Sequence, residues 1–266
     1  FFVVIGIIFL IDTKFTVADD LQLPFNGFIE YSFSARTTEN IYKRDDILMN
    51  EIRAQLEFSR NLEKSAFNFK LDILQDAVED KTDLQLREAN ITIFPSKYWE
   101  LKLGRQILTW GTGDLVFCND LFPKDWNSFF LGRDNEYLKA PSDAIKFSMF
   151  TNLGNFNLII SPKFTPDNYI TGERMSYWGP NGLTGNTFND TRPAITLKNM
   201  EYHFRYSKIF GDLEFALYTY KGFMKRPLGY DFINNLVFFP KLAAHGVSFR
   251  KQVFGGIINL ETCYYD

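Results

Sequence analysis

Apolar and polar residues alternate along most of the chain after residue 18. In the stretch 27–36, Ile29 and Phe33 fall on one side, and Glu30 and Ser32 fall on the other. Successive side chains of a β-strand point to opposite faces, so a period of two predicts strands with one apolar and one polar face. The strands predicted in this way span residues 27–36, 48–58, 67–73, 84–94, 99–107, 144–150, 156–164, 197–206, 213–223, 243–253 and 257–265.

The connections between these strands alternate between short and long. The short ones lie near residues 60–64, 95–98, 151–155, 207–212 and 254–256, and the long ones near 37–46, 75–83, 109–143, 165–196 and 224–241. A soluble sandwich has no reason to place a long loop at every second connection, whereas outer-membrane barrels have tight turns at one rim and long loops at the other. The predicted fold class is therefore all-β, an antiparallel transmembrane β-barrel with short periplasmic turns and long extracellular loops.

About eleven strands are predicted, whereas single-chain bacterial barrels have an even number. The segment 261–266 also stops inside the last predicted strand. An unclosed sheet would leave unsatisfied backbone groups in lipid. We therefore expect residues 19–266 to be a C-terminally truncated portion of an outer-membrane β-barrel.

The first eleven residues form an apolar run that is too short to cross a bilayer as a helix. It has the length of a signal-peptide core, and Thr16 and Ala18 are small residues of the kind found at a cleavage site. The prediction is a partial signal peptide at residues 1–18. A buried strand is the alternative, because periodicity does not identify short apolar runs.

Composition and charge narrow the class of partner. Aromatic residues make up 17% of the chain, which suits both pleated sheets and the aromatic girdles of membrane barrels. The formal charge is −3, with acids and bases interspersed, so we expect no nucleic-acid partner. Cys118 and Cys263 are the two cysteines, and they lack the spacing of a metal site. We expect no disulfide between them, because nothing in the sequence requires them to meet.

In a barrel, the polar face of each strand lines the lumen. The candidate pore-lining residues on strands are Arg53, Lys70, Glu88, Lys102, Arg105, Gln106, Lys146 and Arg205. Their charges, together with the acids on the same faces, nearly balance, so no ion preference is predicted. Strict alternation from Leu103 points Arg105 toward lipid, and either a bulge at Gly104 or a position near the rim would resolve this conflict.

The segment 109–143 is far longer than an ordinary hairpin loop, and such segments are usually functional. Gly111 and Gly113 permit a tight reversal, and aromatic residues such as Trp126 can anchor the segment on a wall. The charged candidates for a constriction are Asp114, Asp120, Lys124, Asp125, Arg133, Asp134 and Glu136. A surface loop packed outward and a surface that binds a partner or ligand are the alternatives.

A family resemblance joins these observations. The segment 103–113 (LGRQILTWGTG), with Leu86-Arg-Glu-Ala89 before it and Phe122-Pro-Lys-Asp-Trp126 after it, resembles the core of Gram-negative outer-membrane barrels of the alginate-export and porin-like group. The similarity is clearest over residues 84–150. It implies a lumen lined by the Gly-Arg-Gln segment, a location in the bacterial outer membrane, and diffusion or export of a small hydrophilic solute. Porins are commonly trimers, so a homo-oligomer is compatible with the resemblance.

No enzymatic activity, cofactor or metal is predicted. His203 and His245 are the two histidines, and regular alternation places His245 and Ser248 on opposite sides of a strand, which prevents a direct proton relay. The sequence contains no HExxH motif and no phosphate-binding glycine loop. The predicted function is an outer-membrane porin-like channel with lipid and a small solute as partners. The alternative is a non-transport barrel, or a secreted β-sheet protein, that binds a ligand or surface partner through its long loops.

Overall fold

The structure is a computed structural model of the chain. It describes residues 2–16, 22–37, 42, 46–113, 115–179, 182–185, 189–231 and 236–266. None of the helices in these ranges is long and apolar enough to span a membrane.

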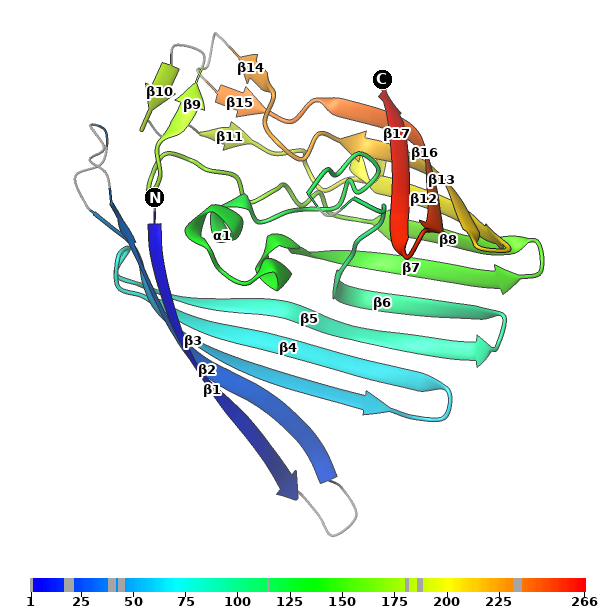
Figure 1. The fold of residues 1–266 in the computed structure, drawn as a ribbon, viewed down its shortest axis with the longest axis horizontal. Helices are drawn as coiled ribbons and strands as arrows, with labels where there is room; N and C mark the ends of the chain where they lie inside the picture. Colours follow the sequence, from blue (N-terminus) through cyan, green and yellow to red (C-terminus); the bar gives the residue numbers. More distant parts are fainter. Residues whose placement is uncertain are drawn as a thin grey trace. The chain divides into compact units, whose positions relative to one another are not determined.

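The fold is almost entirely antiparallel β-sheet (Figure 1). The strands of the main sheet are β1 (Phe2–Thr16), β2 (Gln22–Arg36), β3 (Ile47–Asn61), β4 (Ser65–Asp76), β5 (Lys81–Ser96), β6 (Trp99–Ile107), β7 (Pro141–Thr151), β8 (Gly154–Ser161), β12 (Glu201–Phe210), β13 (Leu213–Phe223), β16 (Lys241–Val253) and β17 (Gly256–Tyr265). Hydrogen-bonded neighbours follow chain order throughout, and the sheet is not closed, with β1 and β17 at its two ends. The all-β prediction is confirmed, and each of the eleven predicted strands corresponds to one strand between β2 and β17.

The remaining elements are short and belong to the long connections. They are α1 (Trp126–Leu131), η1 (Asn135–Leu138), β9 (Tyr177–Gly179), β10 (Gly182–Thr184), β11 (Asp190–Thr191), η2 (Leu197–Asn199), β14 (Gly229–Asp231) and β15 (Leu236–Phe238). Strands β9 and β10 form a small hairpin, and β11, β15 and β14 form a three-stranded sheet.

The chain divides into two compact units. The first unit contains residues 1–90, 124–140 and 167–189, and the second contains 91–123, 141–166 and 190–266. Strand β5 begins in the first unit and ends in the second. The long segment after β6 is also divided, because residues 108–123 belong to the second unit and residues 124–140 to the first.

In the first unit, the polar face of the sheet is covered and the apolar face is exposed. On β3, Glu51 and Arg53 are each 3% exposed, whereas Ile52 on the opposite face is 51% exposed. On β2, Ser32 is buried while Ile29 and Tyr31 are exposed. This is the reverse of a soluble sheet, in which the apolar face packs into the core.

The second unit shows the same reversal. On β12, Glu201 is 1% exposed and His203 is 2% exposed. The alternate residues Tyr202 and Phe204, on the opposite face, are each 40% exposed. The exposed face continues across neighbouring strands through Leu217 and other apolar residues. In each unit we call the covered side of the main sheet the polar face and the exposed side the apolar face.

One predicted long connection is wrong. Residues 75–83 were expected to form a long loop, but β4 ends at Asp76 and β5 begins at Lys81, which leaves a tight four-residue turn. The Asp76 carboxylate accepts hydrogen bonds from the backbone N–H groups of Val78 (2.9 Å) and Glu79 (3.2 Å), and Asp80 adopts a positive φ of 50°. Aspartate favours both features, so a charged stretch that resembles a solvated loop closes a hairpin.

The first strand was not among those predicted from alternation. Residues 2–16 form β1, which pairs with β2 in antiparallel register from Phe2 opposite Arg36 to Thr16 opposite Gln22. The signal peptide expected at residues 1–18 stays a prediction, because strand pairing does not report on cleavage.

Candidate functional site

The polar face of the first unit is covered by residues 124–140, the second half of the long segment after β6. Helix α1 begins at an N-cap, Asp125, whose carboxylate accepts from the Ser128 N–H at 2.7 Å, and it ends at Gly132 with a φ of 82°. Capping by aspartate and a left-handed glycine define both ends of this short helix. Leu131 then packs in a buried cluster with Met49 of β3, which fixes α1 on the sheet.

Tyr137 of η1 is the main contact between this segment and the strands. Its ring is 3% exposed and lies between two cations: the guanidinium carbon of Arg53 is 4.0 Å from the ring centre and that of Arg87 is 4.5 Å. The Gln55 amide donates to the Tyr137 hydroxyl at 3.3 Å. Burial raises the pKa of Tyr137, so the phenol stays neutral and can accept this bond.

The two arginines are themselves held in place. Arg53 Nη1 is 2.7 Å from Asp72 Oδ2, and both side chains are buried. Gln55 Nε2 donates to the other Asp72 oxygen at 2.9 Å. Arg87 donates to the backbone carbonyl oxygens of Glu136 (3.0 Å) and Lys139 (3.4 Å), so β5 binds the backbone of the segment as well as its ring.

A second ionic cluster lies beside the first. Glu51, which is buried on β3, accepts from Arg133 Nε at 3.0 Å and from Arg174 Nη1 at 2.9 Å. Arg174 also forms ion pairs with Asp76 and with Glu79. Burial alone would lower the pKa of Arg133, but the carboxylate of Glu51 raises it, so this guanidinium remains charged. Arginine suits such a site because its fork of donors can serve two carboxylate oxygens.

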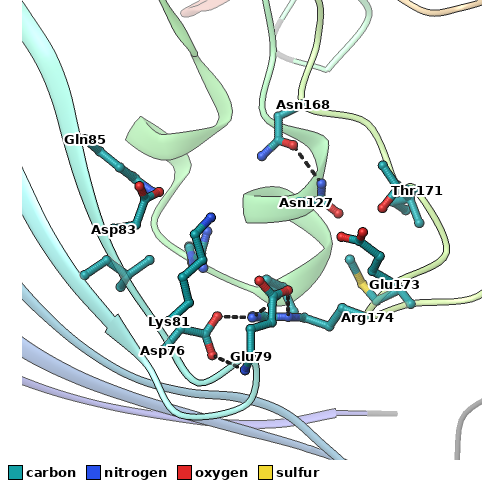
Figure 2. Close-up of a pocket in the computed structure, with 15 residues that line it drawn as sticks. Asp76, Glu79, Lys81, Asp83, Gln85, Asn127, Asn168, Thr171, Glu173 and Arg174 are labelled. Carbon is teal, nitrogen blue, oxygen red and sulfur yellow. Dashed lines mark hydrogen bonds and ion pairs between the residues drawn. The ribbon is translucent and has the colours of Figure 1, made fainter. Parts of the chain in front are cut away.

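A pocket of about 240 Å³ opens above this cluster (Figure 2). Figure 2 shows Asp83 and Gln85 of β5 on one side, and Thr171 and Glu173 on the other. Asn127 of α1 closes one end, where its amide donates to Asn168 Oδ1 at 2.9 Å.

Most of the groups around this pocket are polar, and Leu74, Leu131, Ile170 and Met175 supply the apolar part of its lining. The charged ones carry both signs: Asp76, Glu79, Asp83 and Glu173 against Lys81, Arg133 and Arg174. A site of this kind holds water and small hydrophilic molecules through hydrogen bonds, and it has too little apolar lining for the usual drug-like ligand site.

Residues 108–123 cover the polar face of the second unit. Phe122 is 2% exposed and stacks on His203 of β12, with ring centres 4.3 Å apart. Trp110 contacts Phe122 edge-on at 5.1 Å and lies 6.1 Å from the ring of Tyr218 on β13. His203 therefore serves as part of an aromatic platform for the loop.

The prediction that Cys118 and Cys263 form no disulfide is wrong. Cys118 and Cys263 form a disulfide with their Cα atoms 5.8 Å apart, although 145 residues separate them in sequence. The physical reason is that β17 presents its polar face to the loop: Glu261 accepts from the Thr112 hydroxyl at 3.0 Å, and the Tyr265 hydroxyl donates to the Cys118 carbonyl at 2.7 Å. No local feature of the sequence reveals that these two segments meet.

A buried ion pair lies in the second unit where β12 begins and β13 ends. Lys225 Nζ lies 2.8 Å from each oxygen of Glu201 and 3.3 Å from the Thr165 carbonyl oxygen. The Tyr220 hydroxyl donates to the same carboxylate and accepts from the Phe223 N–H at 2.9 Å. Two partners, Lys225 and Tyr220, thus satisfy one carboxylate that would be costly to bury alone.

The predicted pore-lining residues fall into three groups. The members of the first group lie on the polar faces of their strands. They are Arg53, Lys70, Glu88, Gln106, Lys102, Lys146 and Arg205. Lys70 is 3.6 Å from Glu57 and 3.9 Å from Glu136, and Arg205 pairs with Glu214 at 2.9 Å.

Arg105 is the exception. Its register partner is Asp143, and Arg105 Nη1 lies 3.5 Å from Asp143 Oδ1. Two residues before Arg105, Leu103 pairs with Ile145, which is exposed on the apolar face. Arg105 therefore lies on the apolar face at the end of β6, as strict alternation suggested, and it does not line the polar face. Gly104 has a positive φ of 112°, but the pairing stays in register through it.

The predicted constriction residues have different partners. Arg133 and Glu136 contact the strands, while Asp125 and Asp134 cap α1 and η1. Asp120 accepts from the Thr109 hydroxyl at 2.8 Å. Lys124 is 2% exposed and its backbone N–H donates to Asp167 at 2.9 Å. Asp114 lies outside the described residues.

Several residues of the site were missed from the sequence. Tyr137 and Arg174 were not selected as candidates, and Arg87 would face the other way under strict alternation, whereas Glu51 was counted among the acids on the predicted lumenal faces. Arg87 and Asn90 are both buried although they are three residues apart, so the alternation changes phase between them. A break in the period within β5 was the available signal.

No protein-family model matches the chain, and no curated protein matches it. The resemblance to alginate-export and porin-like barrels therefore stays a prediction. Within the described part of the chain, no group of three or more His, Cys, Asp or Glu side chains is arranged to hold a metal ion.

Proposed function

We propose that this chain forms wall strands of a bacterial outer-membrane porin-like channel for small hydrophilic solutes, with residues 109–143 folded inward as its constriction. The proposal includes membership of the alginate-export and porin-like group. In this interpretation the apolar faces of both units meet lipid and the polar faces line the lumen.

The observation that carries the proposal is the reversal of the two faces. A soluble protein rarely exposes contiguous apolar surface, and it does not normally cover a charged sheet face while leaving the apolar face open. The exposed apolar residues on strands include Ile29, Tyr31, Ile52, Leu56, Ile73, Ile145, Leu158, Tyr202, Phe204, Leu217 and Phe249. Lipid on the outside and water on the inside give both faces a favourable environment.

The contacts of the long segment support its role as a constriction. In each unit its residues pack on the polar face, and the contacts with the strands include ion pairs and stacked rings as well as a small buried apolar cluster. The pocket beside Arg133 is polar and carries both signs of charge. Mixed charges favour a neutral or dipolar hydrophilic solute over an anion or cation, because a ring of one sign is what selects ions.

The test is reconstitution of the full-length protein, of which this chain is proposed to form wall strands, into planar lipid bilayers. Stepwise single-channel currents are the expected result. A protein that inserts, as shown by protection from protease in liposomes, but carries no current would contradict transport. That result would favour the alternative of a barrel that binds a partner through its long loops.

A further inference from the structure

A second groove, of about 470 Å³, lies in the second unit where β12, β13 and β16 reach their long connections. Tyr202 of β12, Lys221 of β13 and Ala243 of β16 form one register row on the apolar face. Lys198 of η2 and Lys241 at the start of β16 complete the groove. The groove therefore combines apolar wall with three lysines from three different elements.

The three lysines are exposed, and none has an ion pair among the described residues. Asp266 is the only carboxylate among the lining residues, and its backbone is hydrogen-bonded to Ala243. The groove thus keeps a net positive charge beside an apolar wall.

Position matters because a lysine on a lipid-facing surface is costly near the bilayer centre and nearly neutral at the interface. Lysine side chains near the ends of membrane strands can lay their methylene stems on apolar surface and place the ammonium at the headgroup level. The exposed rings of Tyr202 and Phe204 and the side chain of Leu217 extend from this end along the apolar face. An amphiphile with an anionic head and apolar chains matches this pattern of charge and surface.

We propose that this groove binds the phosphate headgroup of an anionic lipid, with the acyl chains lying along Tyr202, Phe204 and Leu217. The inference rests on the proposed function, because only a membrane barrel presents this face to lipid. Lys198, Lys221 and Lys241 form a three-point contact with the phosphate oxygens, since lysine binds phosphate as a flexible point charge.

The test compares a variant with a matched control. In the variant, Lys198, Lys221 and Lys241 are all changed to Gln. In the control, Lys97, Lys208 and Lys251, which lie near the short turns at the other ends of the second unit's strands, are changed to Gln. Both proteins lose three positive charges, so the total charge is equal and only its location differs.

Binding is measured by native mass spectrometry in detergent, titrating phosphatidylglycerol against phosphatidylcholine. The wild-type and control proteins are expected to bind phosphatidylglycerol more tightly than phosphatidylcholine. In the groove variant this preference should fall by about a hundredfold, because each basic residue near a lipid surface contributes about 1 kcal/mol. Equal preference in the variant and the wild type would overturn the inference. Equal competition by inorganic phosphate would also overturn it, because the site would then recognise a soluble anion rather than a lipid.

The outcome is separable from that of the proposed function. A protein that conducts in bilayers but shows no lipid preference leaves the channel intact and rejects the lipid site. A protein that neither inserts nor conducts rejects both.

Discussion

Tyr137 offers the sharpest test of how the long segment is held. Replacing it with alanine removes a ring that is 3% exposed and stacked by two guanidinium groups at 4.0 and 4.5 Å. Truncating a buried aromatic side chain to alanine costs about 3–5 kcal/mol. Arg53 keeps its ion pair with Asp72, and Arg87 keeps its hydrogen bonds to two backbone carbonyl oxygens. The loss of the two cation–π contacts therefore adds only about 1 kcal/mol in total to this cost.

The expected consequence is local rather than global. Residues 124–140 should detach from the polar face more often, with the free energy of opening lowered by about 5 kcal/mol, which corresponds to roughly a 5,000-fold increase in the rate of hydrogen exchange at the amides of η1. Single-channel conductance should rise at the same time, because the segment spends more time away from the wall.

The control is Tyr137→Phe, which retains the ring and both stacked cations. It removes only the hydroxyl that accepts from Gln55 at 3.3 Å, a loss of about 0.5–1.5 kcal/mol. Exchange and conductance should therefore stay close to wild type. The reasoning fails if the alanine variant exchanges at the wild-type rate, or if phenylalanine and alanine have the same effect.

Three further predictions concern stability and the loop. Replacing Cys118 and Cys263 together with alanine should lower the free energy of unfolding by about 2–5 kcal/mol in urea titrations, and no change would mean that the disulfide does not form. Glu51→Gln leaves two buried arginines facing a neutral amide and should cost about 3–5 kcal/mol in the same titration, with Glu51→Asp less harmful. In Gly246→Ala, the new Cβ would overlap a side-chain oxygen of the packed loop, so protease sensitivity of the loop should increase, whereas Gly256→Ala, which has room, should resemble wild type.

The sheet was predictable because its signal is local. Alternation with a period of two identifies a strand and its two faces from a few neighbouring residues, and every predicted strand exists. The turn at residues 77–80 was missed because charged residues suggest a solvated loop, and only the hydrogen bonds of Asp76 show a hairpin.

The site was less predictable because it depends on contacts between distant parts of the chain. Arg53 was identified from its place in β3, but its partner Tyr137 lies more than eighty residues later in a segment without periodicity. The disulfide is the extreme case, with 145 residues between the two cysteines. Such pairs depend on how a long connection packs on the sheet. No short stretch of the sequence indicates this packing.

The central claim is that the apolar face meets lipid and the polar face meets water, and spin labels along β4 test it most directly. Labels at Phe67, Leu71 and Ile73 sample one face, and labels at Asn68 and Lys70 sample the other. In liposomes we predict collisions with oxygen at the first set and with a water-soluble nickel chelate at the second, alternating with a period of two. The account would be contradicted if the nickel chelate reached the labels at Phe67, Leu71 and Ile73 while the labels at Asn68 and Lys70 were inaccessible to it.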